Sequence, residues 1–84
     1  MNCRELYFAR LRERFDLVEE TLEFAHPPSV ADLIAYLQAR GGVWAEELSA
    51  TKSFRVAVNQ QLVKTDAHIP DHAEVAIFPP VTGG

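Results

Sequence analysis

The residues of this chain best suited to chemistry are the two glycines at its end, Gly83 and Gly84. Glycine has no Cβ, so both residues could pass through a channel that is too narrow for any other residue. The carboxylate of Gly84 is therefore the first candidate for a reactive group. Linkers can also end in two glycines, so this feature gains weight only from the residues before it. Pro79 and Pro80 stiffen the approach and should reduce the entropy lost when a partner holds the segment.

None of the side chains forms a recognisable catalytic or metal-binding motif. Cys3 is the only cysteine, which excludes an intrachain disulfide, a cysteine-based zinc site and an iron–sulfur cluster. His68 and His72 have the i,i+4 spacing of two ligands on a helix, but Pro70 between them disfavours that helix. The sequence also lacks a nucleophile elbow and a glycine-rich phosphate loop. We therefore expect a chain that binds no metal or cofactor itself.

The composition is that of one small globular domain with an acidic balance. The 84 residues include 8 Lys and Arg against 12 Asp and Glu, which gives a net charge of −4. Nucleic-acid binding usually needs a basic face that displaces counterions from phosphates, and the sequence shows no such cluster. No stretch approaches the roughly 20 apolar residues of a membrane span, and the first residues do not resemble a signal peptide. We expect a cytoplasmic protein that binds neither nucleic acid nor membrane.

Period-two alternation of apolar residues predicts several short strands. The predicted strands cover residues 3–9, 19–24, 54–58, 62–63 and 74–78. In the last of them, Val75 and Ile77 share one face, whereas Ala76 and Phe78 share the other. The charged stretch 10–16 is expected to be a connection between the first two strands.

The clearest helix begins after two consecutive prolines. Ser29 is a favourable N-cap, and Asp32 three residues later offers a capping box. Apolar residues then recur at i, i+3, i+4 and i+7, which makes one apolar stripe of Val30, Leu33, Ile34 and Leu37. Gly41-Gly42 supplies residues that tolerate the left-handed backbone at which helices often end.

These elements predict an α+β domain in which one main helix lies across one face of a mixed sheet of four to five strands. We expect the domain to span residues 1–78 and an extended tail to span residues 79–84. The other face of the sheet would be uncovered, and an uncovered face that carries aromatic residues is a candidate partner surface. Phe78 either points to that face or packs at the edge of the core, and periodicity leaves both readings open.

Three stretches of the sequence resemble one family in their order and spacing. The ending, Phe78-Pro79-Pro80-Val81-Thr82-Gly83-Gly84, is similar to the C-terminal signature of the molybdopterin synthase small subunits, which are ubiquitin-like sulfur carriers of molybdenum cofactor biosynthesis. Leu6-Tyr7-Phe8-Ala9-Arg10-Leu11-Arg12-Glu13 resembles the first strand of that family, and Val58-Asn59-Gln60 with Leu62 resembles its third-strand exit. The chain departs from the family at Asp71-His72-Ala73, where an Asp-Gly-Asp-like turn is common.

The resemblance implies a β-grasp fold and a cycle of reactions at the terminal carboxylate. An ATP-dependent activating enzyme, an adenylyltransferase that uses ATP and Mg²⁺, adenylates Gly84. A sulfur donor protein then converts the adenylate into a thiocarboxylate. The large synthase subunit binds the carrier, and the thiocarboxylate gives its sulfur to a cyclic pterin phosphate to form the dithiolene. The family's complex is a heterotetramer of two small and two large subunits, with the catalytic residues on the large subunit.

By the same resemblance, the site divides into a tail and an interface. The tail residues would lie in a channel of the partner and bring Gly84 to its active site: Pro79, Pro80, Val81, Thr82 and Gly83. Four residues map to the partner-binding surface: Phe8, Arg12, Leu62 and Phe78. Core packing is the competing interpretation for Phe8, and an intramolecular ion pair is the competing interpretation for Arg12.

Three other functions fit a chain with this ending. Another sulfur carrier of the same fold would serve thiamine synthesis or tRNA thiolation, although the Pro-Pro-Val-Thr stretch favours the molybdopterin assignment. A ubiquitin-like modifier would join Gly84 to target lysines through isopeptide bonds. A pure interaction module would use only its surface and would leave the tail inert.

Overall fold

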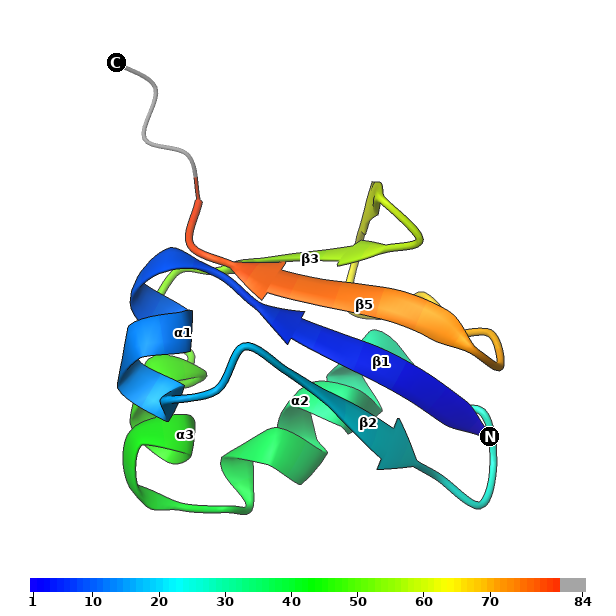
Figure 1. Ribbon diagram of the computed structural model, residues 1–84, viewed down its shortest axis with the longest axis horizontal. Helices are drawn as coiled ribbons and strands as arrows, with labels where there is room; N and C mark the ends of the chain where they lie inside the picture. The colour runs from blue at the N-terminus through cyan, green and yellow to red at the C-terminus, as the bar shows by residue number, and fades with distance from the viewer. Residues whose placement is uncertain (81–84) are drawn as a thin grey trace.

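A computed structural model describes residues 1–80 of the chain and shows an α+β fold of five strands and three helices over that range. The elements in chain order are β1 (Asn2–Tyr7), α1 (Ala9–Phe15), β2 (Glu19–Glu23), α2 (Val30–Gln38), α3 (Gly42–Glu47), β3 (Arg55–Val58), β4 (Gln61–Val63) and β5 (Ala73–Phe78). Figure 1 shows α2 lying across one side of the sheet, with α1 and α3 side by side at the end toward which β1 and β5 run. None of the helices in this range is long and apolar enough to cross a membrane.

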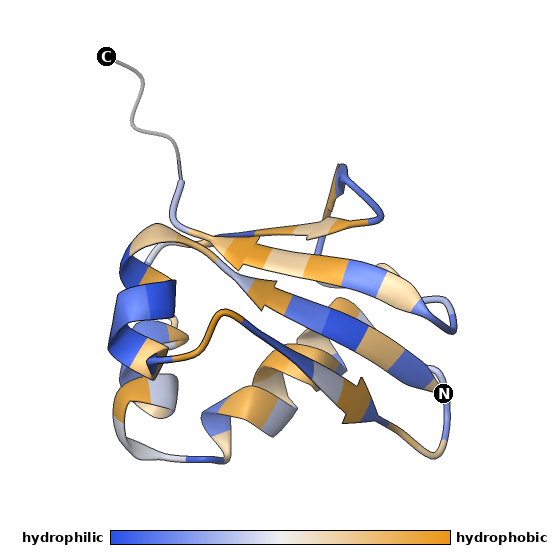
Figure 2. Ribbon diagram, in the orientation of Figure 1, coloured by the Kyte–Doolittle hydropathy of each residue, from blue (hydrophilic) through white to orange (hydrophobic). Residues whose placement is uncertain are grey.

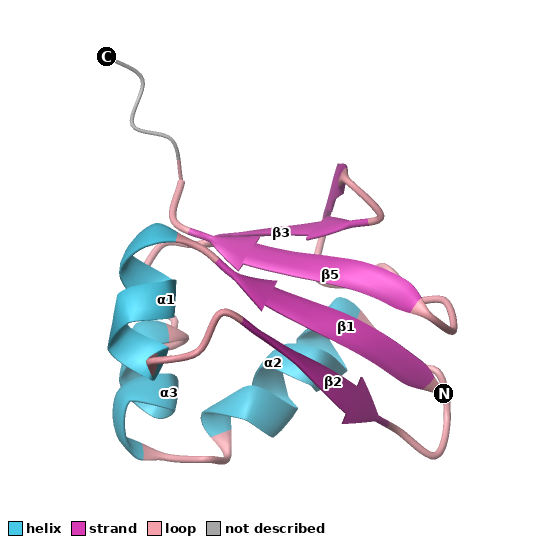
Figure 3. Cartoon of the chain, in the orientation of Figure 1, coloured by secondary structure: helices cyan, strands magenta, loops and turns pink. Residues whose placement is uncertain are grey.

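The five strands form one mixed sheet in the order β2-β1-β5-β3-β4 (Figure 3). The central strands β1 and β5 are parallel, and every other neighbouring pair is antiparallel. A parallel pair needs a crossover between its strands, and here that crossover contains α2 and α3. This topology is the β-grasp arrangement, so the predicted fold is confirmed.

The core lies between α2 and the sheet, as the apolar stripe predicted. All four stripe residues are buried: Val30, Leu33, Ile34 and Leu37. From the sheet, Val75 and Ile77 of β5 are fully buried against them. The capping box is also present, because the Asp32 N–H donates to Ser29 Oγ (3.1 Å) and the Ser29 N–H donates to Asp32 Oδ2 (3.0 Å). Figure 2 shows strongly hydrophobic residues on α2 and the strands.

The charged stretch 10–16 is mostly a helix, so the prediction of a simple connection is wrong. Helix α1 places Leu11 and Phe15 on one side, four residues apart, and both are buried in the core. Its other positions are largely hydrophilic (Figure 2). The helix ends at Asp16, which adopts the left-handed conformation with φ 53°. Burial of two apolar residues at helical spacing therefore favours a helix here, although so many charged residues are typical of a loop.

Strand β1 ends at Tyr7, two residues before the predicted end, and Phe8 becomes the N-cap of α1. The buried face of β1 consists of Cys3, Glu5 and Tyr7, whereas Leu6 is on the opposite, partly exposed face. A glutamate therefore occupies a core position of this strand, which hydrophobic alternation did not predict.

An aromatic cluster closes the core between β1, α1 and α3. The rings of Phe15 and Trp44 stack with centroids 3.8 Å apart, and Tyr7 meets both rings edge-on. Trp44 packs against the core and is only partly buried. This tryptophan therefore helps to fix α1 and α3 at the end of the sheet.

The turn at Asp71-His72-Ala73 adopts a positive φ without a glycine, because His72 has φ 62°. Two hydrogen bonds tie the turn to the start of β1. The Asn2 N–H donates to Asp71 Oδ1 (2.8 Å), and the His72 N–H donates to the Asn2 carbonyl (2.6 Å). These contacts compensate for the unfavourable backbone and align β5 beside β1.

Candidate partner-binding site

The face of the sheet opposite α2 carries a row of apolar side chains that no helix covers. The strand register places Leu6 opposite Ala76, Ala76 opposite Ala57, and Ala57 opposite Leu62. This row crosses β1, β5, β3 and β4, and we call it, together with Phe8 and Phe78, the open face. Leu62 is 68% exposed at one end of it. An exposed apolar surface of this kind is typical of a protein-binding site.

Two of the predicted interface residues meet in a single hollow on the open face. Phe8 and Phe78 line it together with Ala76, Gln60 and Glu74, and its volume is about 440 Å³. Phe8 is 44% exposed, so it does not pack into the core. Phe78 alternates with the buried residues Val75 and Ile77 of β5 and is only partly buried. The structure thus places Phe78 on the uncovered face rather than at the edge of the core.

Arg12, the fourth predicted interface residue, lies on α1 one turn after Phe8. Its backbone N–H donates to the Phe8 carbonyl at 3.4 Å, which places the two residues at adjacent levels of the helix start. The side chain is exposed and pairs with no carboxylate among residues 1–80. The competing intramolecular ion pair is therefore not observed in this part of the chain.

Ion pairs border the open face on its β2 side. The Arg4 guanidinium lies 3.2 Å from Glu19 and 3.4 Å from Glu74, and all three side chains are substantially exposed. Such surface pairs contribute at most about 1 kcal/mol to stability. They leave a face with an apolar middle and a charged rim, which is the usual anatomy of a protein interface.

The tail follows β5, a central strand that pairs with a neighbour on each side. Strand β5 pairs with β1 up to Ile77 and with β3 up to Phe78, and the partly buried Pro79 and Pro80 follow. Proline has no N–H to donate, so the ladder stops there. The remaining predicted tail residues Val81, Thr82 and Gly83 and the predicted reactive residue Gly84 lie outside the described residues.

A partly buried polar cluster lies on the other side of the sheet, and no sequence pattern predicted it. Glu20 of β2 accepts hydrogen bonds from Tyr7 Oη (2.7 Å) and from both terminal nitrogens of Arg40 (2.8 and 2.9 Å). Burial opposes ionisation of Glu20, but the hydrogen bonds from Arg40 and Tyr7 outweigh it and hold the pKa of that carboxyl below its ordinary value. The Arg40 guanidinium also lies 4.4 Å from the centre of the Trp44 ring.

Glu5 faces this cluster but takes no part in its hydrogen bonds. The residue is fully buried, and neither carboxyl oxygen has a hydrogen-bond partner among residues 1–80. Burial and the neighbouring charge of Glu20 raise the pKa of Glu5 to about 9. The same two causes, with Glu5 itself, raise the pKa of the buried Cys3 thiol to about 11, which makes that thiol unreactive.

The open face is the candidate functional site of this part of the chain, and it is a surface suited to binding a protein. Residues 1–80 hold no group of three or more side chains that could bind a metal ion. Within these residues, the ionisable cluster combines the buried Glu5 and Tyr7 with the partly buried Glu20 and the exposed Arg40, on the face of the sheet opposite the open face. The class that the fold and this site define is that of the ubiquitin-like β-grasp proteins, in which a compact domain presents a C-terminal tail.

Comparison with known proteins identifies the family within that class. Residues 6–84 match the ThiS family, and the chain belongs to it. The chain is 42% identical to the molybdopterin synthase sulfur carrier subunit of Escherichia coli (strain K12), over 94% of this chain and 95% of that protein. It is 36% identical to the subunit of the same name from Haemophilus influenzae, with the same coverage. These matches confirm the family resemblance predicted from the ending.

A solved structure supports the fold assignment independently. The putative molybdopterin converting factor, subunit 1, from Pyrococcus furiosus superposes with a TM-score of 0.83 at 30% sequence identity. The match covers 96% of this chain and 99% of that chain. The two proteins therefore share the complete domain and not merely a common motif.

Proposed function

We propose that this chain is the sulfur-carrier subunit of a molybdopterin synthase. The observation that carries the proposal is the match, over nearly the full length of both chains, to relatives named as sulfur carrier subunits of that enzyme. The open face and the ending at Gly84 fit this role. Because residues 1–80 offer no catalytic side-chain cluster, the reactive group of the carrier is its terminal carboxylate.

The chemistry begins with activation of a poor electrophile. Attack of the Gly84 carboxylate on the α-phosphate of ATP forms an acyl adenylate and releases pyrophosphate, and hydrosulfide-level sulfur from a donor then displaces AMP from the acyl carbon with loss of a proton. The product is a thiocarboxylate, a soft nucleophile that is ionised at neutral pH without a local base. It displaces an oxygen substituent from a carbon of a cyclic pterin phosphate, and hydrolysis of the resulting thioester leaves the sulfur on the pterin and restores the Gly84 carboxylate.

The geometry suits delivery into a partner's active site. Six residues from Pro79 to Gly84 span about 20 Å when extended, which is enough to reach a buried pocket. The open face begins where the tail starts, at Phe78 and Phe8, so one docking event would seat the domain and insert the tail. The pterin substrate is anionic and this chain has a net charge of −4, so the large subunit supplies the cationic residues that hold the substrate.

The proposal assigns the remaining components to other proteins. The large synthase subunit, two copies of which join two carriers in a heterotetramer, holds the catalytic residues. An adenylyltransferase binds ATP and Mg²⁺, and a donor protein supplies the sulfur. We place this cycle in the cytoplasm.

Intact-mass measurement after incubation with the activating enzyme, ATP and a sulfur source tests this function. The expected result is the mass gain of one oxygen exchanged for one sulfur, and a variant that lacks Gly84 should show no gain. A series of heavier lysine adducts would instead indicate a protein modifier. If neither product forms, the chain is an interaction module with an inert tail.

A further inference from the structure

The ladder between β3 and β4 splits after only three residue pairs. Val56 pairs with Val63, and continuing the same register would place Phe54 opposite Thr65. The Thr65 carbonyl instead accepts a hydrogen bond from the Ala31 N–H (2.9 Å) in the first turn of α2. That bond satisfies a helix-terminal donor and pulls the chain after β4 away from β3. The backbone of Phe54 is left without a backbone hydrogen bond to any of residues 1–80.

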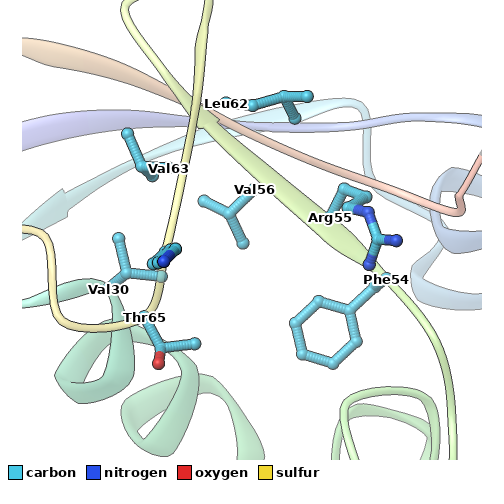
Figure 4. A pocket seen from close by; sticks show the side chains of 8 residues that line it. Val30, Phe54, Arg55, Val56, Leu62, Val63 and Thr65 are labelled. Carbon is cyan, nitrogen blue, oxygen red and sulfur yellow. The ribbon is translucent and has the colours of Figure 1, made fainter.

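The split opens a groove with an apolar floor. Its volume is about 660 Å³, and its lining consists of Val30, Phe54, Arg55, Val56, Leu62, Val63, Lys64 and Thr65. Figure 4 shows the side chains of Val56 and Val63 extending toward Val30, with the Phe54 ring forming the opposite wall. The groove thus combines an apolar pocket with the unpaired backbone of Phe54, the residue just before β3, and these are the two features that an added strand uses.

Two cations stand on the rim of this groove and lack partners among the described residues. The chain has 8 basic residues, and those that form ion pairs with glutamates are Arg4, Arg10, Arg14 and Arg40. Arg55 and Lys64 form no such pair within residues 1–80, although the protein as a whole is acidic. Unpaired cations beside an apolar floor favour an occupant that brings both carboxylates and an apolar side chain.

We propose that this groove is a second docking site, which binds an extended acidic segment of a partner protein by strand addition beside Phe54. The segment places an apolar side chain on the floor formed by Val56 and Val63, and its flanking carboxylates pair with Arg55 and Lys64. Leu62 borders both the groove and the open face, so the two surfaces are continuous. The inference does not depend on the proposed sulfur chemistry, because the groove and the tail are different parts of the molecule.

Selection from a display library of short random peptides on the immobilised full chain tests this site. The selected peptides should share an apolar β-branched or aromatic residue flanked by Asp or Glu. In amide NMR spectra, a selected peptide should shift the signals of Phe54, Lys64 and Thr65. Peptides without acidic residues, shifts confined to Phe8 and Ala76, or no peptide retained above the bare support would each overturn the proposal.

Matched charge reversals at two exposed lysines distinguish peptide binding in the groove from a general effect of net charge. Lys64→Glu should lower the affinity for the selected peptide about tenfold, because the variant loses one charge-assisted contact and gains a repulsion. Lys52→Glu changes the net charge equally but lies outside the groove lining, so it should alter affinity by less than about twofold. Equal weakening by both variants would overturn the site. Each variant should still be converted to the thiocarboxylate, so failure here is distinguishable from failure of the proposed function.

Discussion

Glu5 is an acidic residue in a buried environment that disfavours its charged form. It lies directly opposite Glu20 in the β1–β2 ladder, on the same face, and both carboxyls point toward the core side of the sheet. Arg40 and Tyr7 donate hydrogen bonds to Glu20, whereas no group within the described residues donates one to Glu5. Two ionised carboxylates cannot share this space, so Glu5 remains a neutral acid while Glu20 is charged.

Stability should therefore fall as the pH rises. The pKa of Glu5 is about 9 in the folded chain against 4.5 as its ordinary value, so the folded state binds the extra proton between those values. The contribution is fully present below about pH 4.5 and is lost as the pH rises toward 9. Urea unfolding across this window should show a decline on the order of a few kcal/mol, which Glu5→Gln should largely remove.

The exposed Glu13 provides the control for this titration. Glu13→Gln removes a carboxylate that forms no ion pair within residues 1–80, so it should leave the pH dependence unchanged. A decline of the same size in the wild type and in Glu5→Gln would show that another group causes it.

A single substitution at Phe78 tests whether this side chain belongs to the partner-binding surface or to the core. Phe78→Asp should weaken binding to the large synthase subunit by about 2 kcal/mol or more, because it places a charge in the apolar hollow shared with Phe8. Titration calorimetry measures the affinity. Val18→Asp changes an equally apolar exposed residue outside the open face and should have little effect. Unchanged affinity of Phe78→Asp would refute the interface assignment, and loss of folding would place Phe78 in the core.

At the scale of elements, one buried glutamate holds α1 in place. Glu47 of α3 is only 3% exposed and accepts hydrogen bonds from Arg10 Nε (3.0 Å) and Arg14 Nε (3.1 Å) of α1. The short helix is thus fixed by contacts more than thirty residues away in sequence. Since α1 follows Phe8 directly, this clamp also sets the position of one end of the open face.

Glu47→Gln should lower the free energy of unfolding by about 1–2 kcal/mol, because it weakens two charge-assisted hydrogen bonds at a buried site. Its neighbour Glu46 makes one exposed ion pair with Arg14, so Glu46→Gln should cost less than about 0.5 kcal/mol. Chemical denaturation of the two variants gives the comparison directly. Equal losses would mean that burial of Glu47 adds nothing to the clamp.

The contrast between α2 and α1 shows what local sequence can predict. Helix α2 carries its own N-cap and a full apolar stripe, so its start and buried face follow from neighbouring residues. Helix α1 has two apolar anchors, and two of its arginines, Arg10 and Arg14, pair with glutamates of a distant element. The burial of Glu5 and the split of the β3–β4 ladder likewise depend on tertiary contacts, which the periodicity of the sequence does not predict.

At the scale of the whole molecule, one face of the sheet contributes to stability, and the other face is available for binding a partner. One face packs against α2 and forms the core, and the other presents apolar side chains beside the point where the tail leaves. The sequence predicted this division and three residues of the open face: Phe8, Leu62 and Phe78. The family resemblance mapped these three residues to a partner surface, whereas the alternation of β5 alone left Phe78 open between that face and the edge of the core. The groove beside β3 was not predicted.

The central claim is that sulfur travels on Gly84 and is transferred to a pterin. The direct test starts from carrier isolated as the thiocarboxylate, mixed with the large subunit and a cyclic pterin phosphate in the absence of ATP. Mass spectrometry should show the carrier returning to its carboxylate form while dithiolene appears, with two carriers consumed for each pterin because a dithiolene contains two sulfur atoms. A thiocarboxylate that persists in the presence of active large subunit and pterin would contradict the account.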